Sequence, residues 1–375
     1  MNKLPKRKKK ICWITPDYFL CADAFVVPEL STEYEIEWIL INTLNTKRKS
    51  DGLVLETFKP KEYNLKYRQK DPRIIFQYFN LLNKIRQSDA DIIYISFHGL
   101  PYFFPIFFLL IDPNKVIYGA HNVSTPKGAS NERLMRLYHN YVYKRIKNFH
   151  VFSNYQLSVI KDMVPNKSHY YAPLTLEDYG PSDITPVNGT IRFLFFGYIR
   201  EYKRLDLLIN AFQELHNSGI QNIELYIAGN CDNWETYESL ITFPEGIKKR
   251  IEIIPNRDIP DIVSSCHYMV LPYQDGAQSA VLTLAYQYNK PVIVSDIESF
   301  KQFVVDGSTG FVFRNKSKES LIDVMKAVVA EHDCNYQKLK GNIKSFVEKE
   351  FAIERIIGRY KGFLNECMEK SSSNV

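Results

Sequence analysis

The sequence lacks the cysteine patterns of a disulfide-rich or zinc-binding protein. Its six cysteines are scattered along 375 residues, with no CxxC pair and no histidine cluster nearby. This distribution argues against a disulfide framework and against a zinc site, and it suits a reducing cytosol. We therefore expect a cytoplasmic protein with no metal site and no cofactor.

The sequence also lacks an apolar run long enough to cross a membrane as a helix. The longest run, LPYFFPIFFLLI from Leu100 to Ile111, contains two prolines and falls short of the roughly 20 residues that a spanning helix needs. A buried helix is the favoured interpretation of this run, and an interfacial membrane segment is the alternative. A signal peptide is not expected, because the basic start MNKLPKRKKK leads into ICWIT, which has the length of one strand.

What the sequence does contain is the composition of a soluble globular protein, 45% hydrophobic and 24% charged. At roughly 150 residues per domain, its length suggests about two domains. Residues 1–190 carry 26 Lys and Arg against 18 Asp and Glu, whereas residues 191–375 carry 22 against 24. A basic half can attract an anionic membrane face, a phosphorylated lipid or nucleic acid. Because no nucleic-acid-binding module accompanies it, we favour the membrane surface, with a solvated tail as the alternative for Lys6 to Lys10.

Short apolar runs alternate with longer amphipathic segments along the chain, as in parallel sheets covered by helices. In the first half, strands are expected at 11–15, 35–41, 91–96, 115–118 and 149–153, and helices at 77–88 and 132–147. In the second half, strands are expected at 191–196, 223–228, 251–254, 268–272, 291–295 and 310–313, and helices near 204–216, 233–241, 259–265, 280–288, 298–304 and 317–332.

Prolines and glycines between Tyr171 and Thr190 mark a domain boundary. We predict an α/β protein with two Rossmann-like, doubly wound domains, residues 1–178 and 179–351, that face a cleft. A final helix at 352–368 is expected to pack back on the first domain.

Two segments of the second half suit an anion. The first is the turn at 277–281, where Gln278, Ser279 and Ala280 precede or open a short helix whose first N–H groups lack intrahelical partners. Small residues there allow a diphosphate to approach the backbone. The alternative is an ordinary connection in which Ser279 is only an N-cap.

The second segment, GYIREYKRLDLLINAF, follows the strand at 191–196. Gly197 permits a sharp exit from the strand, and Arg200 and Lys203 then lie three residues apart, which suits a phosphate pair. Taken alone, these cations with Arg204 would more often be a solvated face. Together with the helix start at 278–281, they indicate two phosphate-binding devices at the same edge of one sheet.

Three runs, FFGYIREYKRLDLLINAF, IPDIVSSCHYMVLPYQDGAQSAVLTLAYQYNKPVIVSD and VVDGSTGFVF, resemble the donor-binding domain of GT-B glycosyltransferases of the retaining glycosyltransferase family 4. The resemblance covers most of residues 191–330. The first half resembles the family more loosely, through YGAHNVSTPKG and FHVFSNYQ.

The resemblance implies that Arg200 and Lys203 hold the diphosphate of a nucleotide-sugar donor, and that His121 lies close to the transferred sugar. His121 could equally be a hydrogen-bonded structural histidine. The donor-binding residues implied with them are Gly197, Asn256, Ile259, Gln278, Ser279, Ala280 and Val281.

The sequence departs from the family in two places. Many members carry two glutamates eight positions apart, one of which holds the ribose, and here those positions are Gly276 and Leu284. The sequence instead resembles a subset with a QSG-V core, here QSAV, so ribose binding cannot be transferred. A Gly-rich loop after the first strand is also missing, which leaves Asp17 as the only early polar candidate for contacting the acceptor.

The resemblance predicts a metal-independent glycosyltransferase that moves a sugar from a nucleoside-diphosphate sugar to a glycan or polyprenyl-linked acceptor, with retention, in polysaccharide or glycolipid assembly. The enzyme would be cytoplasmic or peripheral on the inner face of the plasma membrane. A GT-B epimerase or phosphorylase and a non-catalytic nucleotide-sugar-binding subunit are the rivals. Nucleic-acid binding is a further alternative, because the first half of the chain is basic.

Overall fold

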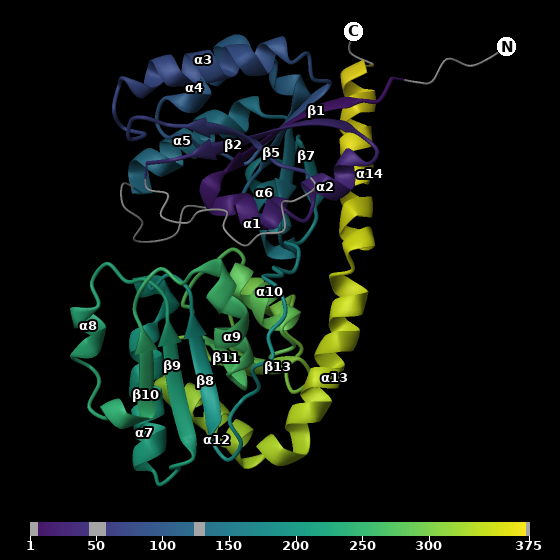
Figure 1. Cartoon of the computed structure of the whole chain (residues 1–375). Helices are drawn as coiled ribbons and strands as arrows, with labels where there is room; N and C mark the ends of the chain where they lie inside the picture. Colours follow the sequence, from purple (N-terminus) through teal and green to yellow (C-terminus); the bar gives the residue numbers. More distant parts are fainter. Residues whose placement is uncertain (1–6, 45–57, 124–131, 373–375) are drawn as a thin grey trace, which may run out of the picture. The chain divides into compact units, whose positions relative to one another are not determined.

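The computed structural model describes residues 7–44, 58–123 and 132–372, and these divide into two compact units. The first unit ends at Thr175 and is completed by a helix that begins at Ile353, whereas the second runs from Leu176 to Ala352. Each unit is built on one sheet (Figure 1). The basic start up to Lys6 and the part of YGAHNVSTPKG after Val123 lie outside the described residues.

The sheet of the first unit has the strand order β3-β2-β1-β4-β5-β6-β7, and its pairings are parallel. The strands are β1 (Lys10–Pro16), β2 (Glu35–Asn42), β3 (Lys61–Asn64), β4 (Ile92–Ile95), β5 (Val116–Gly119), β6 (Asn148–Val151) and β7 (Ser168–Tyr171). Side chains of a strand alternate between the two faces of the sheet. Cys12 and Ile14 of β1 therefore enter one core, while Trp13 stacks on Tyr94 of β4 on the other face, with ring centroids 3.8 Å apart. Burial on both faces explains the near-continuous apolar runs.

The helices of the first unit cover both faces of this sheet. They are η1 (Asp17–Phe19), α1 (Leu20–Asp23), α2 (Val27–Ser31), α3 (Ile74–Gln87), α4 (Phe103–Leu110), η2 (Pro113–Lys115), α5 (Glu132–Arg145), α6 (Asn154–Met163) and α14 (Ile353–Ser372). The last helix, α14, follows the second unit in the sequence but belongs to the first unit. Its Tyr360 and Phe363 lie with ring centroids 4.9 Å and 5.0 Å from the ring of His150 on β6. An amphipathic stripe at helical spacing therefore completes the core of a unit that begins some 350 residues earlier.

The sheet of the second unit has the order β10-β9-β8-β11-β12-β13, again with parallel pairings. The strands are β8 (Ile191–Phe196), β9 (Ile223–Ala228), β10 (Ile247–Arg250), β11 (Tyr268–Leu271), β12 (Val292–Ser295) and β13 (Gly310–Phe313). The helices are η3 (Glu201–Lys203), α7 (Leu205–Asn217), α8 (Glu235–Glu238), η4 (Pro244–Gly246), η5 (Asn256–Asp258), α9 (Ile259–Ser264), α10 (Ala280–Gln287), α11 (Glu298–Lys301), α12 (Lys318–Ala330) and α13 (His332–Glu350). This order reverses direction between β8 and β11, and ligands of doubly wound sheets bind beyond the carboxyl ends of the strands at such a reversal.

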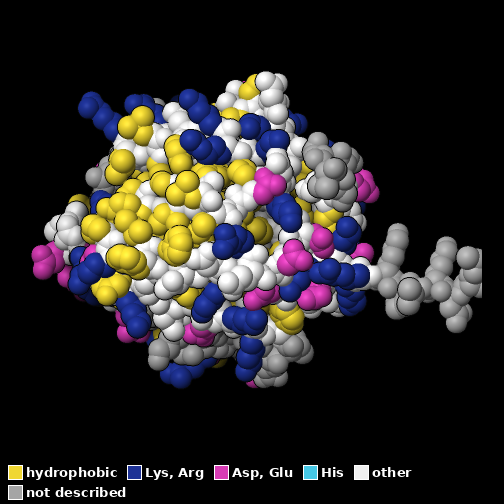
Figure 2. All heavy atoms as spheres, turned by 90° about the horizontal axis from the view of Figure 1, so that it is seen from above, with side chains coloured by type: hydrophobic (Ala, Val, Ile, Leu, Met, Phe, Trp, Pro, Cys, Tyr) yellow, Lys and Arg dark blue, Asp and Glu magenta, His cyan; other side chains and the backbone are white. Residues whose placement is uncertain are grey.

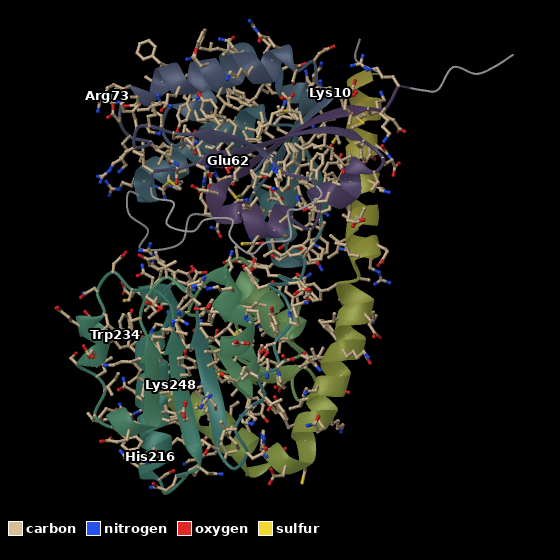
Figure 3. The ribbon with its side chains drawn as sticks, in the orientation of Figure 1. Lys10, Glu62, Arg73, His216, Trp234 and Lys248 are labelled. Carbon is tan, nitrogen blue, oxygen red and sulfur yellow. The ribbon has the colours of Figure 1, made fainter. Side chains whose placement is uncertain are left out.

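The strands that the sequence pattern missed or misplaced lie at sheet edges. β3 and β7 were not expected, and the strand expected at 251–254 is wrong, because β10 occupies Ile247–Arg250 instead. An edge strand has one neighbour and need not be apolar, so its position follows from pairing with that neighbour, here β9 for β10. Glu62 on β3 and Lys248 on β10 are exposed accordingly (Figure 3).

Most of the expected helices are present, but several helices were not expected, among them α1, α2 and α6 in the first unit. The 19-residue helix α13 was not expected, although its buried Tyr336, Leu339 and Ile343 have helical spacing. The run from Leu100 to Ile111 does form a helix, α4, with Phe103, Phe104 and Phe107 buried, but Leu109 on its outer side is 83% exposed. The buried-helix interpretation therefore holds for one face of α4 only. Among the helices of the described ranges, none has both the length and the apolarity to span a membrane.

A buried carboxyl group in the first unit links its stability to pH. Asp23 accepts hydrogen bonds from Nε1 of Trp13 (3.0 Å) and from Oγ1 of Thr15 (2.5 Å), and its other oxygen has no hydrogen-bond partner. Burial raises the pKa of Asp23 to about 7, against an ordinary value of 3.8. A carboxyl group whose folded-state pKa is raised contributes stability that is complete below pH ~4 and is lost as the pH rises through ~7.

We predict that Asp23→Asn gains stability relative to the wild type as the pH rises from about 4 to about 8, by ~4 kcal/mol at most, because the amide need not ionise. The measurement is urea unfolding of both proteins across this pH range, followed by tryptophan fluorescence. A difference in unfolding free energy that stays constant with pH would contradict the assignment.

Candidate functional site

The loop after β8 brings a lysine to the carboxyl end of the sheet. Gly197 leaves β8 with φ +94°, and the short helix η3 then ends at Lys203. A Cβ atom at Gly197 would lie 3.4 Å from Nζ of Lys203 and 3.4 Å from Cγ2 of Val281. The chain is thus folded so that the ammonium group, the backbone of Gly197 and the start of α10 meet at one place.

Lys203 is held in this position by its surroundings. Only 8% of the residue is exposed, and its Nζ lies 5.3 Å from the centroid of the Tyr273 ring. Tyr273 follows β11, the strand beside β8. Lys203 and the ring that it contacts therefore lie on the two sides of the point where the strand order reverses. A cation over an aromatic face is stabilised by the ring quadrupole, more so where water is excluded.

Arg200 and Arg204 lie in different surroundings from Lys203. Arg200 pairs with Asp232 at 3.3 Å, with the two side chains 56% and 65% exposed, and its guanidinium lies 4.2 Å from the Tyr198 ring centroid. Arg204 adopts the left-handed conformation at φ +52° and makes a two-pronged ion pair with Asp206. The structure therefore brings Lys203 to the carboxyl edge and leaves Arg200 in an exposed ion pair, and it removes Arg204 from the predicted cluster.

The sequence left open whether Ser279 is an N-cap or the start of α10 is an anion site, and the structure allows both. Ser279 is the N-cap, and its Oγ accepts a hydrogen bond from the N–H of Leu282 at 3.3 Å. A cap of this kind satisfies one of the first four N–H groups of a helix. The N–H groups of Ala280 and Val281 belong to the same set and have no acceptor within the helix. Oε1 of Gln278 is buried without a hydrogen-bond partner. The N-cap and the anion-ready helix start therefore coexist.

The loop before α9 places one of its two predicted residues well. Asn256 begins η5, is buried, and has an Oδ1 atom without a hydrogen-bond partner. Ile259, by contrast, has its side chain fully buried at the start of α9, so a ligand could reach only its backbone. The positions of the missing carboxylates differ as well, because Leu284 is buried within α10 while Gly276 lies in the loop beside Asp275.

Sequence reasoning overlooked Gly229, which follows β9 with φ +150°. A Cβ atom there would lie 2.1 Å from the carbonyl oxygen of Gly197, so only glycine allows the two loops to approach. The approach is reinforced by hydrogen bonds from the N–H of Gly197 to Ala228 (2.9 Å) and from that of Ile199 to Asn230 (2.8 Å). The signal was present in the sequence as a glycine directly after a strand.

In the first unit, His121 follows β5 and is buried. Its ring stacks on Phe19 with centroids 3.6 Å apart, its carbonyl accepts from Nε2 of Gln156 at 2.6 Å, and its Nε2 atom has no hydrogen-bond partner. Burial, followed by the neighbouring His98 and His150, lowers the pKa of His121 well below 6.5. His121 is therefore a neutral imidazole near pH 7 and offers a hydrogen bond, not a positive charge.

A second histidine, His98, adjoins His121, and a third, His139, adjoins His98; neither was singled out from the sequence. The ring centroid of His98 lies 6.0 Å from that of His121 and 5.7 Å from that of His139, and His98 also bonds to the hydroxyl of Tyr118. Burial lowers the pKa of His98 to about 3. Within the part of the chain that the structure describes, no three His, Cys, Asp or Glu side chains gather so that they could hold a metal ion.

Asp17, the first residue of η1, accepts hydrogen bonds from two neighbouring segments. One carboxylate oxygen accepts from the N–H (2.6 Å) and the hydroxyl (3.0 Å) of Thr43, which follows β2, and the other accepts from the N–H of Tyr18 at 2.7 Å. Burial raises the pKa of Asp17, while these hydrogen bonds lower it. The carboxylate thus ties the ends of β1 and β2 together.

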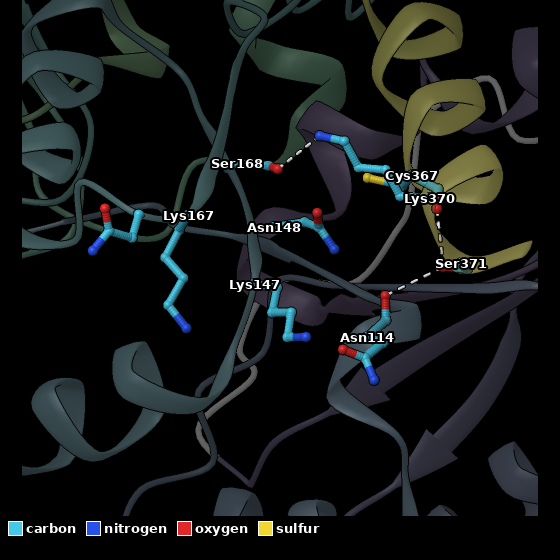
Figure 4. Close-up of a pocket in the computed structure, with 9 residues that line it drawn as sticks. Asn114, Lys147, Asn148, Lys167, Ser168, Cys367, Lys370 and Ser371 are labelled. Carbon is cyan, nitrogen blue, oxygen red and sulfur yellow. Dashed lines mark hydrogen bonds between the residues drawn. The ribbon is translucent and has the colours of Figure 1, made fainter. Parts of the chain in front are cut away.

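A hollow of about 310 Å³ in the first unit lies away from these residues (Figure 4). It lies at the amino ends of β5, β6 and β7 and beside the end of α14. Its lining residues are Asn114, Lys147, Asn148, Asn166, Lys167, Ser168, Cys367, Lys370 and Ser371. Two of its lysines already have partners, since Lys370 bonds to Ser168 (3.0 Å) and Lys167 to the carbonyl of Lys144 (3.1 Å). It is at the opposite edge of the sheet from the one where doubly wound folds bind ligands.

Comparisons with known proteins find similarity to glycosyltransferases over part or nearly all of the chain. Residues 190–331 match the family model of the glycosyl transferases group 1. An uncharacterized glycosyltransferase of Methanocaldococcus jannaschii is 23% identical over 182 residues, which are 46% of this chain and 44% of that protein, so the match spans less than half of the relative's length.

Two solved structures are similar over nearly the whole chain. A glycosyltransferase from Rickettsia africae has 13% sequence identity and a TM-score of 0.73, covering 96% of this chain and 99% of that one. Anabaena HepE in complex with UDP and glucose has 12% identity and a TM-score of 0.73, covering 96% and 100%.

The class that the fold defines is therefore GT-B, with two Rossmann-like units on parallel sheets, and the predicted fold is confirmed. Within that class, the segment that matches the model of the glycosyl transferases group 1, residues 190–331, carries Lys203 and the start of α10.

We predict that Gly229→Ala destabilises the second unit more than Gly219→Ala does. Both glycines have a left-handed φ, but a Cβ atom at Gly219 meets nothing within 4 Å, whereas at Gly229 it collides with Gly197. The control should lose ~1–3 kcal/mol from backbone strain, and Gly229→Ala a further ~1–3 kcal/mol from overpacking. Urea unfolding measures both losses, and equal values would show that the close approach is not needed.

Proposed function

We propose that the protein is a glycosyltransferase that moves a sugar from a nucleoside-diphosphate sugar to a glycan or lipid-linked acceptor. The observation that carries the proposal is the meeting of Nζ of Lys203, the backbone of Gly197 and the start of α10 at the β8–β11 reversal. A diphosphate is the ligand that a buried ammonium group and a helix N-terminus suit together.

The chemistry follows from where charge develops. In sugar transfer the anomeric carbon becomes cation-like while negative charge builds on the departing phosphate. An ammonium group and N–H dipoles that already face this phosphate stabilise the transition state without reorganising. We assign this role to Lys203 and to the N–H groups of Ala280 and Val281, and we propose that no metal is needed.

We assign Arg200 a second contact with the diphosphate. Its pair with Asp232 is exposed on both sides, and such pairs contribute about 0–1 kcal/mol, so a dianionic ligand can compete for the guanidinium. Gln278 and Asn256 each present a buried oxygen without a hydrogen-bond partner, which suits contacts with hydroxyl or N–H groups of the donor. His121, neutral and with an unbonded Nε2, is suited to a hydrogen bond with a sugar hydroxyl.

A UDP-sugar is the first donor to test, because the similar HepE structure holds UDP and glucose. Retention of the anomeric configuration is proposed from the family resemblance. We further propose polysaccharide or glycolipid assembly by a peripheral protein on the inner face of the plasma membrane, supported by the excess of Lys and Arg in residues 1–190.

A non-catalytic nucleotide-sugar-binding subunit is the second candidate. It is favoured by Gly276 and Leu284, which cannot supply the carboxylates that many relatives use. The two candidates separate when donor binding is measured by thermal shift with UDP-, GDP- and ADP-sugars, and transfer is measured with the same donors and membrane extract. Binding without transfer would select the subunit.

We predict that Lys203→Met lowers kcat/KM for sugar transfer by about 10²–10³-fold, the cost of one transition-state donor. The methionine fills the same space without the charge, so the fold should be retained and the melting temperature should fall only by what the contacts of the ammonium group, such as that with the Tyr273 ring, contribute. Lys326→Ala, which removes an exposed lysine of α12 in the same unit, is the matched control and should transfer at the wild-type rate. An unchanged rate in Lys203→Met would refute the assignment.

A further inference from the structure

The outer faces of α3, α4 and α5 expose several large apolar side chains. We call them the apolar face, and its members are Ile75, Phe76, Phe79, Leu109, Leu134 and Leu137. The most exposed are Leu109 at 83%, Phe76 at 76% and Leu137 at 66%. Figure 2 shows hydrophobic side chains gathered over one face of the molecule, with Lys and Arg around them. Gathered exposed apolar residues of this kind mark an interaction site.

Helical spacing explains why each helix has two apolar sides. In α3, Tyr78 and Leu82 are buried in the core, while Phe76 and Phe79, three residues apart, lie together on the outer side. In α5, Tyr138 is buried, whereas Leu134 and Leu137 are exposed. The outward residues therefore exceed what core packing uses.

Contacts between the three helices make their outer sides one surface. Tyr78 of α3 and Phe103 of α4 pack edge to face with centroids 5.2 Å apart. The backbone N–H of Phe104 donates to the hydroxyl of Tyr138 on α5 at 3.2 Å, and Phe108 lies 5.9 Å from Tyr141. The apolar face is thus presented by three helices of the first unit that pack on one another.

The charged residues of these helices are mostly basic. α3 carries Lys84 and Arg86 and no acidic residue, and α4 carries no charged residue. The basic residues of α5 are Arg133, Arg136, Lys144 and Arg145, against a single Glu132. The guanidinium of Arg145 lies 3.9 Å from the Tyr141 ring centroid and 5.7 Å from that of Phe108, so its charge is held next to apolar surface.

We propose that the apolar face docks the first unit onto an anionic lipid surface. Phe and Leu side chains on helices enter the boundary between headgroups and acyl chains, while neighbouring Lys and Arg pair with lipid phosphates. Basic residues with an apolar stem favour the same position, because the stem lies along apolar surface while the charge stays in water. A second copy of the chain is a poorer occupant, because a symmetric contact would bring the six basic residues of α3 and α5 in one copy close to the same six in the other.

This inference deepens the proposed function by naming the surface at which a lipid-linked acceptor would be met. It does not require the transfer chemistry, because the binding assay contains no sugar nucleotide. The proposed function fails or stands on the transfer rate of Lys203→Met, whereas the docking proposal fails or stands on vesicle binding.

The test is co-sedimentation of the full chain with vesicles of phosphatidylcholine, with and without phosphatidylglycerol. The wild type should bind the phosphatidylglycerol vesicles, and binding should weaken as salt is added. The variant Phe76→Ser, Phe79→Ser, Leu109→Ser should bind at least about tenfold more weakly, because each buried side chain of this size contributes about one factor of ten or more. Its fold is checked by circular dichroism, since the three side chains are exposed in the free protein.

The matched control is Ile184→Ser, Val187→Ser, which removes exposed apolar side chains from the second unit and should bind like the wild type. Absence of wild-type binding, or equal binding by the triple-serine variant, would overturn the proposal. So would analytical ultracentrifugation that shows a wild-type dimer which the triple-serine variant converts to a monomer, because the face would then join two copies.

Discussion

The parallel pairing of β8 with β11 is the contact on which the candidate site depends. Because the two strands are parallel, their carboxyl ends lie side by side. The loops that follow them, more than 70 residues apart in the sequence, are therefore neighbours. Gly197 then allows the chain to turn, Gly229 leaves room for that turn, and Lys203 and the start of α10 meet beside it. Without this strand order, Lys203 would be one more surface lysine and Ser279 one more helix cap.

Burial decides what each polar group at the two carboxyl edges can offer. Lys203 is buried against an aromatic ring, and an ammonium group there acts on an anion through a medium of lower dielectric than water. Arg200, in an exposed pair, acts through water and contributes less until a ligand shields it. In the first unit, burial keeps His98 and His121 uncharged, so that edge offers hydrogen bonds and aromatic surface and not positive charge. The two units therefore present different chemistry at the corresponding edges of similar sheets.

The central strands and most helices could be predicted because a parallel strand covered on both faces must be apolar along its length. β8 and β9 have the expected limits for this reason, whereas β13 has them although it lies at an edge of its sheet. The edge strands β3, β7 and β10 could not be predicted, because one neighbour and solvent on the other side impose no apolar pattern. The outer side of α4 was hidden for a related reason, since an apolar run in a sequence does not distinguish side chains that face the core from those that face outward.

The sequence by itself determined the α/β class, the position of Gly197 after a strand, the spacing of Arg200 and Lys203, and the cap at Ser279, because these depend on neighbours within a few residues. Only the tertiary structure decided which cation is buried at the edge of the sheet, that Arg204 is held by Asp206, and that Gly229 supports Gly197 from the next strand. Those outcomes depend on contacts between segments distant in the chain, and local spacing carries no information about them. The same holds for the apolar face, which exists only because α3, α4 and α5 pack side by side.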